Sequence, residues 1–275
     1  MIVTPLPYGR MCNRLVLATH FICHVEKHGG SYLHLAFIDY ARYFENTRRS
    51  GVVFYRSTRG DAGGNARKSL FRFESIIRTY DRRGEDRLMD APDFLEKERR
   101  TRCLIAIGWL FRDPNSIKEC GDVARSFFTP AQKHSDAVSR LVEGHRKGCD
   151  TLVGVHIRQT DYAKFVGGRY LYPLSEYRRC MESIAAFSGG MTRFLVASDG
   201  PVDSSAFDGL DVVRPSGHPF QDNLALSRCD LIIGPPSTYS KWAAFIGKVP
   251  LCYIREAGMP VTPESFRCPY SGEDK

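Results

Sequence analysis

The chain has 275 residues, 43% hydrophobic and 25% charged, which is an ordinary globular composition and leaves room for one large domain or two of about 130 residues each. Its net charge of +8 comes mostly from residues 42–102, where 16 Lys and Arg stand against 10 Asp and Glu; such a surface suits nucleic acid, an anionic membrane or a phosphorylated substrate, or is a solvated Arg-rich face, which is commoner. No apolar run approaches the roughly 20 residues that span a bilayer, and the N-terminus lacks the basic start and apolar stretch of a secretory signal, so we expect a cytoplasmic protein.

The first half of the chain begins with a strand–helix–strand unit. Residues 2–5 are predicted to form a strand, and residues 8–13 a glycine-containing loop. A helix of about 15 residues follows, with apolar side chains at helical spacing, until Gly29 and Gly30 end it. A second strand is expected over residues 32–37. This order is that of a βαβ unit and predicts parallel pairing of the two strands.

The middle of the chain is harder to assign. Gly- and Arg-rich sequence at 57–67 indicates a mobile loop, and we assign no elements over 45–100. An apolar run at 103–109 predicts a buried strand. A polar helix is expected over 130–147, ending at Gly148.

The second half alternates strands and helices without interruption. Its helix over 223–229 has Asp222 in position to be the N-cap, and its last helix is closed by Gly247. Alternation of this kind predicts a doubly wound parallel sheet with helices on both faces. The expected strands cover 152–157, 193–197, 211–214, 231–233 and 249–254, and the expected helices cover 175–187, 223–229 and 240–246. We therefore predict an α/β fold of two Rossmann-like domains, residues 1–140 and 141–275.

Polar side chains follow four of the strands of this second sheet. In open α/β sheets the ligand lies beyond the carboxyl ends of the strands, so these residues should share one edge. They are Arg158, Thr160 and Asp161; Ser198 and Asp199; Ser216 and His218; and the segment 234–238.

The segment 234–238 leads directly into a helix whose N-terminus would favour phosphate. Unpaired N–H groups and a partial positive charge lie at such an end, and Ser237, Thr238 and Ser240 add hydroxyls. Arg158 can meet phosphate with a planar, permanently charged fork. Arg158 and this helix end together predict a diphosphate clamp. Alternatively, Ser237 only caps its helix and Arg158 only pairs with Asp161 or Asp199.

Other motifs are absent or weak. The sequence has no phosphate-binding P-loop, no Gly-x-Gly-x-x-Gly and no Asp-x-Asp, and no nucleic-acid-binding motif, so we expect no nucleic-acid partner. His20, His24 and His28 form one stripe of the first helix. They can in principle hold a metal, but we interpret them as a polar helix face and expect no metal site. Nine scattered cysteines are a poor disulfide framework and are expected to be reduced thiols.

Several segments resemble one enzyme superfamily. Residues 153–162, Val-Gly-Val-His-Ile-Arg-Gln-Thr-Asp-Tyr, resemble the His-x-Arg-Arg-x-Asp motif of the α-1,2-, α-1,6- and peptide-O-fucosyltransferases. Residues 194–199 and 221–244 resemble the second and third motifs of that superfamily. The turn from Gly9 to Leu15 is similar to the Gly-x-x-Asn-Gln-Leu turn that opens bacterial α-1,2-fucosyltransferases.

The resemblance implies a GT-B-like fold, with the acceptor on the N-terminal domain and a GDP-sugar on the C-terminal one. It implies an inverting glycosyltransferase without metal or cofactor that transfers L-fucose to a glycan or glycolipid acceptor. The roles that it implies are as follows: His156 and Asp222 for guanosine; Arg158, Ser237 and Thr238 for the β-phosphate; Asp199 for the shape of the nucleotide pocket; and Gly9 and Asn13 for the nucleotide sugar. Asp161 is a candidate general base.

The sequence departs from this pattern at three positions. Gln159 replaces the second arginine of the His-x-Arg-Arg motif, and Cys12 and Arg14 replace the usual Gly and Gln of the opening turn. GDP binding is compatible with these changes, and they leave open a GDP-sugar other than GDP-fucose as the donor. The alternative function is therefore a GDP-sugar- or glycan-binding protein that has lost turnover.

Overall fold

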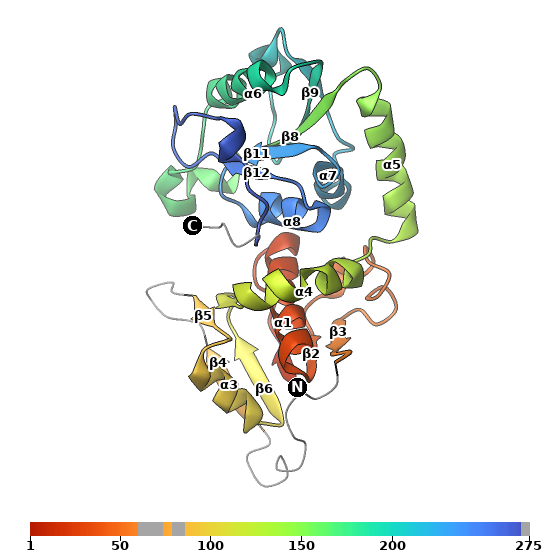
Figure 1. Cartoon of the computed structure of the whole chain (residues 1–275), viewed down its shortest axis with the longest axis vertical. Coiled ribbons are helices and arrows are strands. Elements are labelled where there is room, and N and C mark those ends of the chain that lie inside the picture. The colour runs from red at the N-terminus through yellow and green to blue at the C-terminus, as the bar shows by residue number, and fades with distance from the viewer. Residues whose placement is uncertain (60–73, 79–85, 271–275) are drawn as a thin grey trace. The chain divides into compact units, whose positions relative to one another are not determined.

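The computed structural model describes residues 1–59, 74–78 and 86–270. The chain divides into two compact units, Met1–Gln132 and Lys133–Lys275, each drawn with its elements in Figure 1. The border expected at 140/141 lies inside helix α5 (Gln132–Arg146), which the structure groups with the second unit. The predicted loop at 57–67 falls mostly outside the described residues.

The first unit is built on a five-stranded sheet in the order β3-β2-β1-β6-β4. The pairs β1–β2, β1–β6 and β4–β6 are parallel, as predicted for the opening unit, whereas β2–β3 is antiparallel. A short parallel pair, β5 with β7, lies apart from this sheet. The strands are β1 (Ile2–Thr4), β2 (Ser31–His34), β3 (Val53–Arg56), β4 (Glu74–Arg78), β5 (Arg87–Leu88), β6 (Cys103–Ile107) and β7 (Phe111–Arg112).

The main helices of the first unit pack against its sheet and against each other. Helix α1 (Met11–His28) is buried around nearly its whole circumference, because the sheet covers one side of it and α4 (Pro114–Phe127) packs against another, as Figure 1 shows. Two shorter helices, α2 (Ile38–Ala41) and α3 (Pro92–Arg99), complete the unit. The prediction that the histidines of α1 form a polar outer face is wrong: His20 and His24 are buried, since α1 has almost no solvent-facing side.

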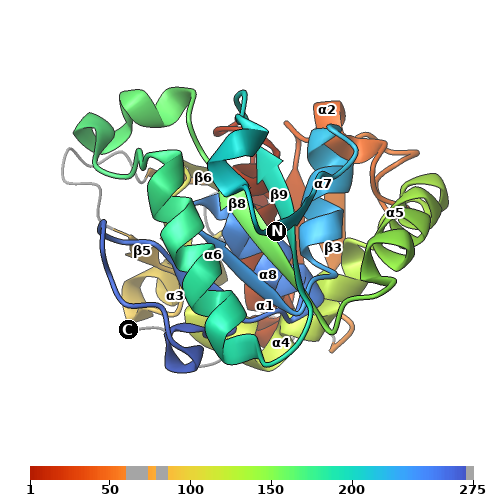
Figure 2. The same cartoon turned by 90° about the horizontal axis from the view of Figure 1, so that it is seen from above.

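The second unit is the doubly wound parallel sheet that the sequence predicts. Its five strands are all parallel, in the order β10-β9-β8-β11-β12, which is the Rossmann order for this number of strands. Helix α6 covers one face, and α7 and α8 cover the other (Figures 1 and 2). The elements are β8 (Thr151–Ile157), α6 (Leu174–Ser188), β9 (Thr192–Ser198), β10 (Asp211–Val213), α7 (Pro219–Leu226), β11 (Leu231–Gly234), α8 (Thr238–Gly247) and β12 (Leu251–Tyr253).

The core of the second unit follows from strand alternation. Val153, Val155 and Ile157 of β8 point to the α6 side, because successive side chains of a strand alternate between faces. Leu226 of α7 packs with residues of α8 in the cluster on the opposite face. Each face of the sheet therefore has its own buried apolar layer.

Helix α7 begins four residues earlier than predicted. Its N-cap is His218, whose ring accepts a hydrogen bond from the backbone N–H of Gln221, and Pro219 occupies the first helical position, where a missing N–H costs nothing. The prediction that Asp222 is the N-cap is therefore wrong. Asp222 lies in the first turn instead.

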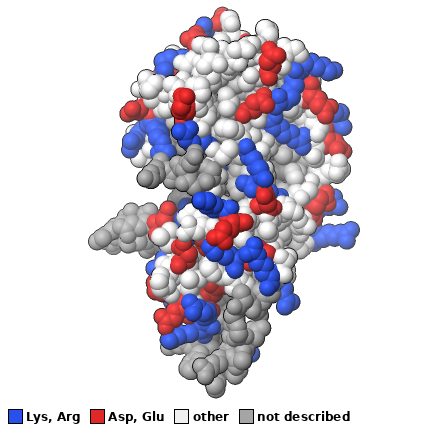
Figure 3. Space-filling view, in the orientation of Figure 1, with Lys and Arg blue, Asp and Glu red and all other residues white. Residues whose placement is uncertain are grey.

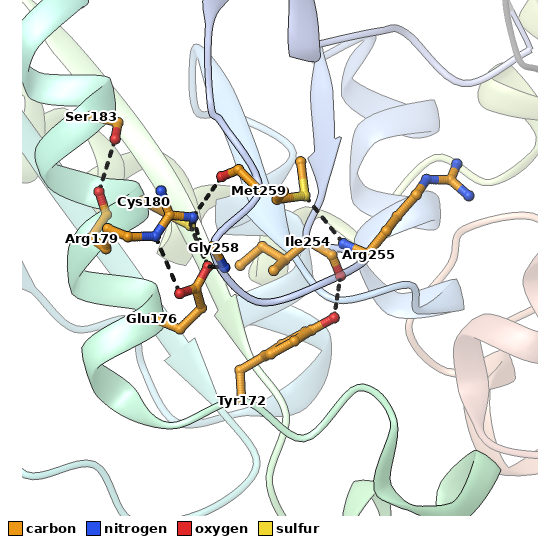
Figure 4. A network of polar contacts seen from close by, with 9 residues as sticks. All are labelled: Tyr172, Glu176, Arg179, Cys180, Ser183, Ile254, Arg255, Gly258 and Met259. Carbon is orange, nitrogen blue, oxygen red and sulfur yellow. Dashed lines mark hydrogen bonds and ion pairs between the residues drawn. The ribbon is translucent and has the colours of Figure 1, made fainter.

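A buried carboxylate anchors the segment after β12 to helix α6 (Figure 4). Glu176 accepts hydrogen bonds from Arg179, at 2.6 and 3.2 Å, and from the backbone N–H of Gly258 at 3.0 Å. Arg179 also donates to the carbonyl of Met259 at 2.6 Å. Tyr172 adds a bond to the carbonyl of Ile254 at 3.1 Å. These contacts fix the chain just beyond the carboxyl end of β12.

Among the described residues, no helix is both long and apolar enough to cross a membrane. On the face drawn in Figure 3, Lys and Arg side chains are interspersed with Asp and Glu. All nine cysteines are free thiols.

Candidate functional site

The second sheet has its topological switch point between β8 and β11. From β8 the chain proceeds outward to β9 and β10, and it then returns to place β11 and β12 on the other side. Ligands of such sheets bind at this point, beyond the carboxyl ends of the strands. The residues that follow β8 and β11 are Arg158 and the turn into α8, which are the two parts of the predicted clamp.

Arg158 lies between two carboxylates and an aromatic ring. Its guanidinium contacts Asp199 at 3.0 Å and also pairs with Asp161. It stacks over the ring of Tyr162, with 5.0 Å from its central carbon to the ring centroid. Its Nε is buried and has no hydrogen-bond partner among the described residues. The alternative interpretation, in which Arg158 pairs with Asp161 or Asp199, is thus realised with both.

Asp199 organises the loop that follows β8. One oxygen accepts the backbone N–H of Gln159 at 2.8 Å, and the other accepts the hydroxyl of Thr160 at 2.6 Å. Burial of this carboxyl opposes its charge, but the bonds from Thr160 and Gln159 and the charge of Arg158 together hold its pKa below the usual value. Asp199 is therefore a fixed anion that sets the position of Arg158.

Tyr162 connects Arg158 to the N-terminus of α8. Its hydroxyl donates to the carbonyl of Pro236, directly before the helix. Ser237 is the N-cap, and its hydroxyl accepts the backbone N–H of Tyr239 at 3.1 Å. The structure thus brings together the two predicted halves of the clamp. Sequence reasoning missed Tyr162, whose only signal was its place at the end of the first motif.

His156 and Asp222 lie on the side of the sheet covered by α7 and α8. His156 is buried, its Nδ1 is 2.7 Å from the hydroxyl of Ser240, and its ring lies 4.7 Å from that of Tyr239. Burial and the nearby charge of Arg158 lower the pKa of His156 to about 3, so the ring is neutral at physiological pH.

Asp222 closes the turn that precedes α7. Its carboxylate accepts the hydroxyl of Ser216 at 2.9 Å and the N–H of Gly217 at 3.0 Å. Burial raises its pKa, although these hydrogen bonds act in the opposite direction. The next residue, Asn223, donates to the carbonyl of Tyr239 at 2.8 Å. Tyr239 therefore touches both His156 and the first turn of α7.

Gly9 and Asn13 belong to the first unit. Gly9 has φ of +62°, and a Cβ there would lie 2.5 Å from the side-chain nitrogen of Asn13, so only glycine fits this turn. Asn13 donates its backbone N–H to the carbonyl of Arg10 at 3.1 Å. The clamp described above is built entirely from the second unit.

The structure is similar to solved structures of fucosyltransferases. A mutant of Arabidopsis thaliana FUT1 in complex with GDP matches with a TM-score of 0.61 and 13% identity, over 96% of this chain and 73% of that one. POFUT1 in complex with GDP matches with a TM-score of 0.50 and 10% identity, over 89% and 93%. NodZ α-1,6-fucosyltransferase soaked with GDP-fucose gives 0.44 and 16%, over 57% and 56%.

No protein-family model matches the sequence, and no curated protein matches it. At these low identities the structural likeness shows the fold. The chain has the GT-B-like α/β fold with parallel sheets that the sequence predicted.

Proposed function

We propose that the protein is an inverting, metal-independent glycosyltransferase that transfers L-fucose from a GDP-sugar to a hydroxyl of a glycan or glycolipid. The observation that supports it is the meeting of Arg158 with the N-terminus of α8 through Tyr162, at the switch point of a Rossmann-type sheet. GDP is proposed as the nucleotide because two solved structures of similar fold are complexes with GDP.

The proposed chemistry is electrostatic stabilisation of the leaving group. As the bond between the sugar and GDP breaks, negative charge collects on the β-phosphate. Arg158 and the backbone N–H groups at Ser237 and Thr238 would stabilise that charge, and preorganised donors of this kind are each worth about 2.7–4 kcal/mol. This set of donors would do the work that a divalent cation does in transferases with an Asp-x-Asp motif.

The remaining roles follow the same proposal. Asp199 positions Arg158, and Asp161, the more exposed partner, gives up its ion pair when phosphate arrives and becomes a candidate base for the acceptor hydroxyl. His156 and Asp222 would flank the guanosine, through the Tyr239 ring and the turn before α7. Gly9 and Asn13 would contact the nucleotide sugar from the first unit.

The test of donor binding is a comparison of nucleotides. GDP is expected to raise the Tm of the wild-type protein more than UDP or ADP does, and Arg158→Ala is expected to abolish the shift. Thr192→Ala is the control, because Thr192 begins β9 and Asp199, the partner of Arg158, follows the other end of that strand. This variant should retain the shift in Tm. A wild-type protein whose Tm responds to no nucleotide would contradict the proposal.

The second candidate function is a protein that binds the GDP-sugar without turning it over. Gln159 favours it, because this residue contributes only its backbone N–H to Asp199 and supplies no second positive charge. GDP-fucose that binds but is neither transferred nor hydrolysed, with a panel of glycan acceptors present, would select this alternative. Gln159→Arg would then be expected to restore measurable hydrolysis.

We also propose that residues 1–140 form the acceptor side and 141–275 the donor side of a cytoplasmic enzyme. The basic segment 42–102 would face an anionic acceptor or the surface of an anionic membrane. Residues 60–73 and 79–85 of this segment, including Arg82 and Arg83, lie outside the described residues, and Arg87 pairs with Asp93. Unchanged activity after neutralising Arg82, Arg83 and Arg87 together would refute this role.

A further inference from the structure

A buried polar cluster lies in the first unit, where α1 passes the start of α4. His24 is central to it: its Nδ1 lies 2.6 Å from Asp113, and its Nε2 lies 2.9 Å from Glu98 on α3. The side chains of His24 and Asp113 are fully buried. Two carboxylates thus hold the two nitrogens of one imidazole in the interior.

His28 adds a second imidazole one helical turn further along α1. Its ring centroid is 4.6 Å from that of His24, and its Nε2 is buried without a hydrogen-bond partner among the described residues. A buried polar nitrogen without a partner is costly and calls for a ligand. One ligand atom each from His24, His28 and Asp113 lie within 4.8 Å of one another.

We propose that His24, His28 and Asp113 bind a divalent transition-metal ion, with Zn²⁺ the best match, and that Glu98 orients His24 through its other nitrogen. Two imidazoles and a carboxylate are a common zinc ligand set, and water takes the fourth position in such three-residue sites. Ligand atoms of a tetrahedral zinc site lie about 3.3 Å apart, so small side-chain rotations close the cluster around the ion. The carboxylate on the far nitrogen of a metal-bound histidine is the usual partner that fixes its orientation.

The charges of the cluster favour a dication. Both nitrogens of His24 face carboxylates, so the metal-free ring carries two N–H groups, and Zn²⁺ takes the place of the proton on Nδ1, which is released to solvent. The ion balances the two negative charges of Asp113 and Glu98, whereas the proton balances only one. The nearest basic side chain on α1, Lys27, is already paired with Glu119 at 2.6 Å.

His20 completes the arrangement without being a ligand. Its Nδ1 accepts the backbone N–H of Asp113 at 2.9 Å. Asp113 also caps α4 by accepting the N–H of Ser116 with its other oxygen, at 2.8 Å. The carboxylate oxygen that faces His24 is therefore held in place from both sides. This site belongs to the first unit and is separate from the donor clamp, so it leaves the proposed metal-independent transfer unchanged.

The test is a metal titration of the full chain after chelator treatment. The wild-type protein is expected to bind one equivalent of Zn²⁺, and Co²⁺ should give the visible spectrum of a four-coordinate N/O site without a thiolate charge-transfer band. His28→Gln should weaken binding about 100-fold or more, and Glu98→Gln about 10–100-fold. His145→Gln, which removes a half-buried histidine of α5, should bind like the wild type.

His28→Gln keeps the Glu98–His24–Asp113 hydrogen bonds, so its metal-free Tm should equal that of the wild type, which separates loss of ligand from loss of fold. Equal metal affinity in the wild type and His28→Gln would overturn the proposal. So would a thiolate band in the Co²⁺ spectrum, because the ion would then lie on cysteine and a proton would be the occupant of the cluster.

Discussion

Arg158 has two carboxylate partners of unequal burial, and this inequality determines how it can receive a phosphate. The side chain of Asp199 is 16% exposed and that of Asp161 is 50% exposed. Exposed ion pairs contribute about 0–1 kcal/mol, so the phosphate of the proposed donor would displace Asp161 at little cost. The pair with Asp199 remains and holds the guanidinium in position.

The two partners should therefore respond differently to the same substitution. Asp199→Asn leaves a mostly buried guanidinium with only its exposed partner, Asp161, and is expected to lower the free energy of unfolding by on the order of 3 kcal/mol. Asp161→Asn, the matched control, should change it by less than about 1 kcal/mol. Urea denaturation measures both. Equal losses would mean that the two pairs hold Arg158 equally.

His156 makes the second residue-scale prediction, on pH. Its folded pKa of about 3 lies below the value of 6.5 for an unperturbed histidine, so between these values the unfolded chain binds a proton that the folded chain does not. Its neutral burial therefore costs no stability above pH 6.5, and the free energy of unfolding falls by about 1.4 kcal/mol per pH unit as the pH drops toward 3.

His156→Asn removes this titration and can keep the bond to Ser240. The variant is expected to lose less stability than the wild type between pH 6.5 and 4, measured by urea denaturation at matched pH values. Parallel curves for the two proteins would show that His156 is protonated in the folded state.

At the scale of elements, most strands and helices of the second unit follow from the sequence. Short apolar strand segments alternate regularly with helical patterns there, and this order is typical of a doubly wound α/β sheet. Helix α4 was not predicted. Its buried side is short and includes Gly121, so its apolar signal is weak, although Asp113 followed by Pro114 is a recognisable helix start. The edge strands β3 and β4 were also missed. β3 does have a β-branched and aromatic run with alternating burial, but both strands are short and flank the Gly- and Arg-rich segment that was interpreted as loop.

The hydrogen bonds of Glu176 and Arg179 that join α6 to the segment after β12 give the element-scale prediction. Glu176→Gln removes the anion that holds Arg179 and Gly258, and hydrogen bonds to charged groups are worth roughly 1.5–3 kcal/mol. Hydrogen exchange at 255–260 is expected to accelerate accordingly. Glu182→Gln, on the same helix but in an exposed pair with Arg178, is the control and should leave this exchange unchanged. Fast exchange of these amides already in the wild type would contradict the anchoring role.

At the scale of the whole molecule, the sequence alone predicts where the candidate site lies but not which side chains contact one another within it. The polar strand ends of a Rossmann-type sheet are predictable because their register follows from the topology. The contacts of Tyr162 with Arg158 and Pro236 are not, since they depend on how a loop folds over the strand ends. The burial of His20 and His24 likewise requires knowledge of what packs around α1.

The second unit carries its own buried clusters on both faces of its sheet and every residue of the clamp. We therefore expect a fragment of residues 133–275 to fold and to bind GDP with a Kd within about tenfold of the full chain, by calorimetry, while transferring no sugar. The same fragment with Arg158→Ala is the control and should not bind. If the fragment is folded by circular dichroism yet does not bind GDP, the first unit must supply nucleotide contacts, and Gly9 and Asn13 become the residues to substitute next. If it binds, the first unit contributes the acceptor and sugar side alone, as the proposed division of labour requires.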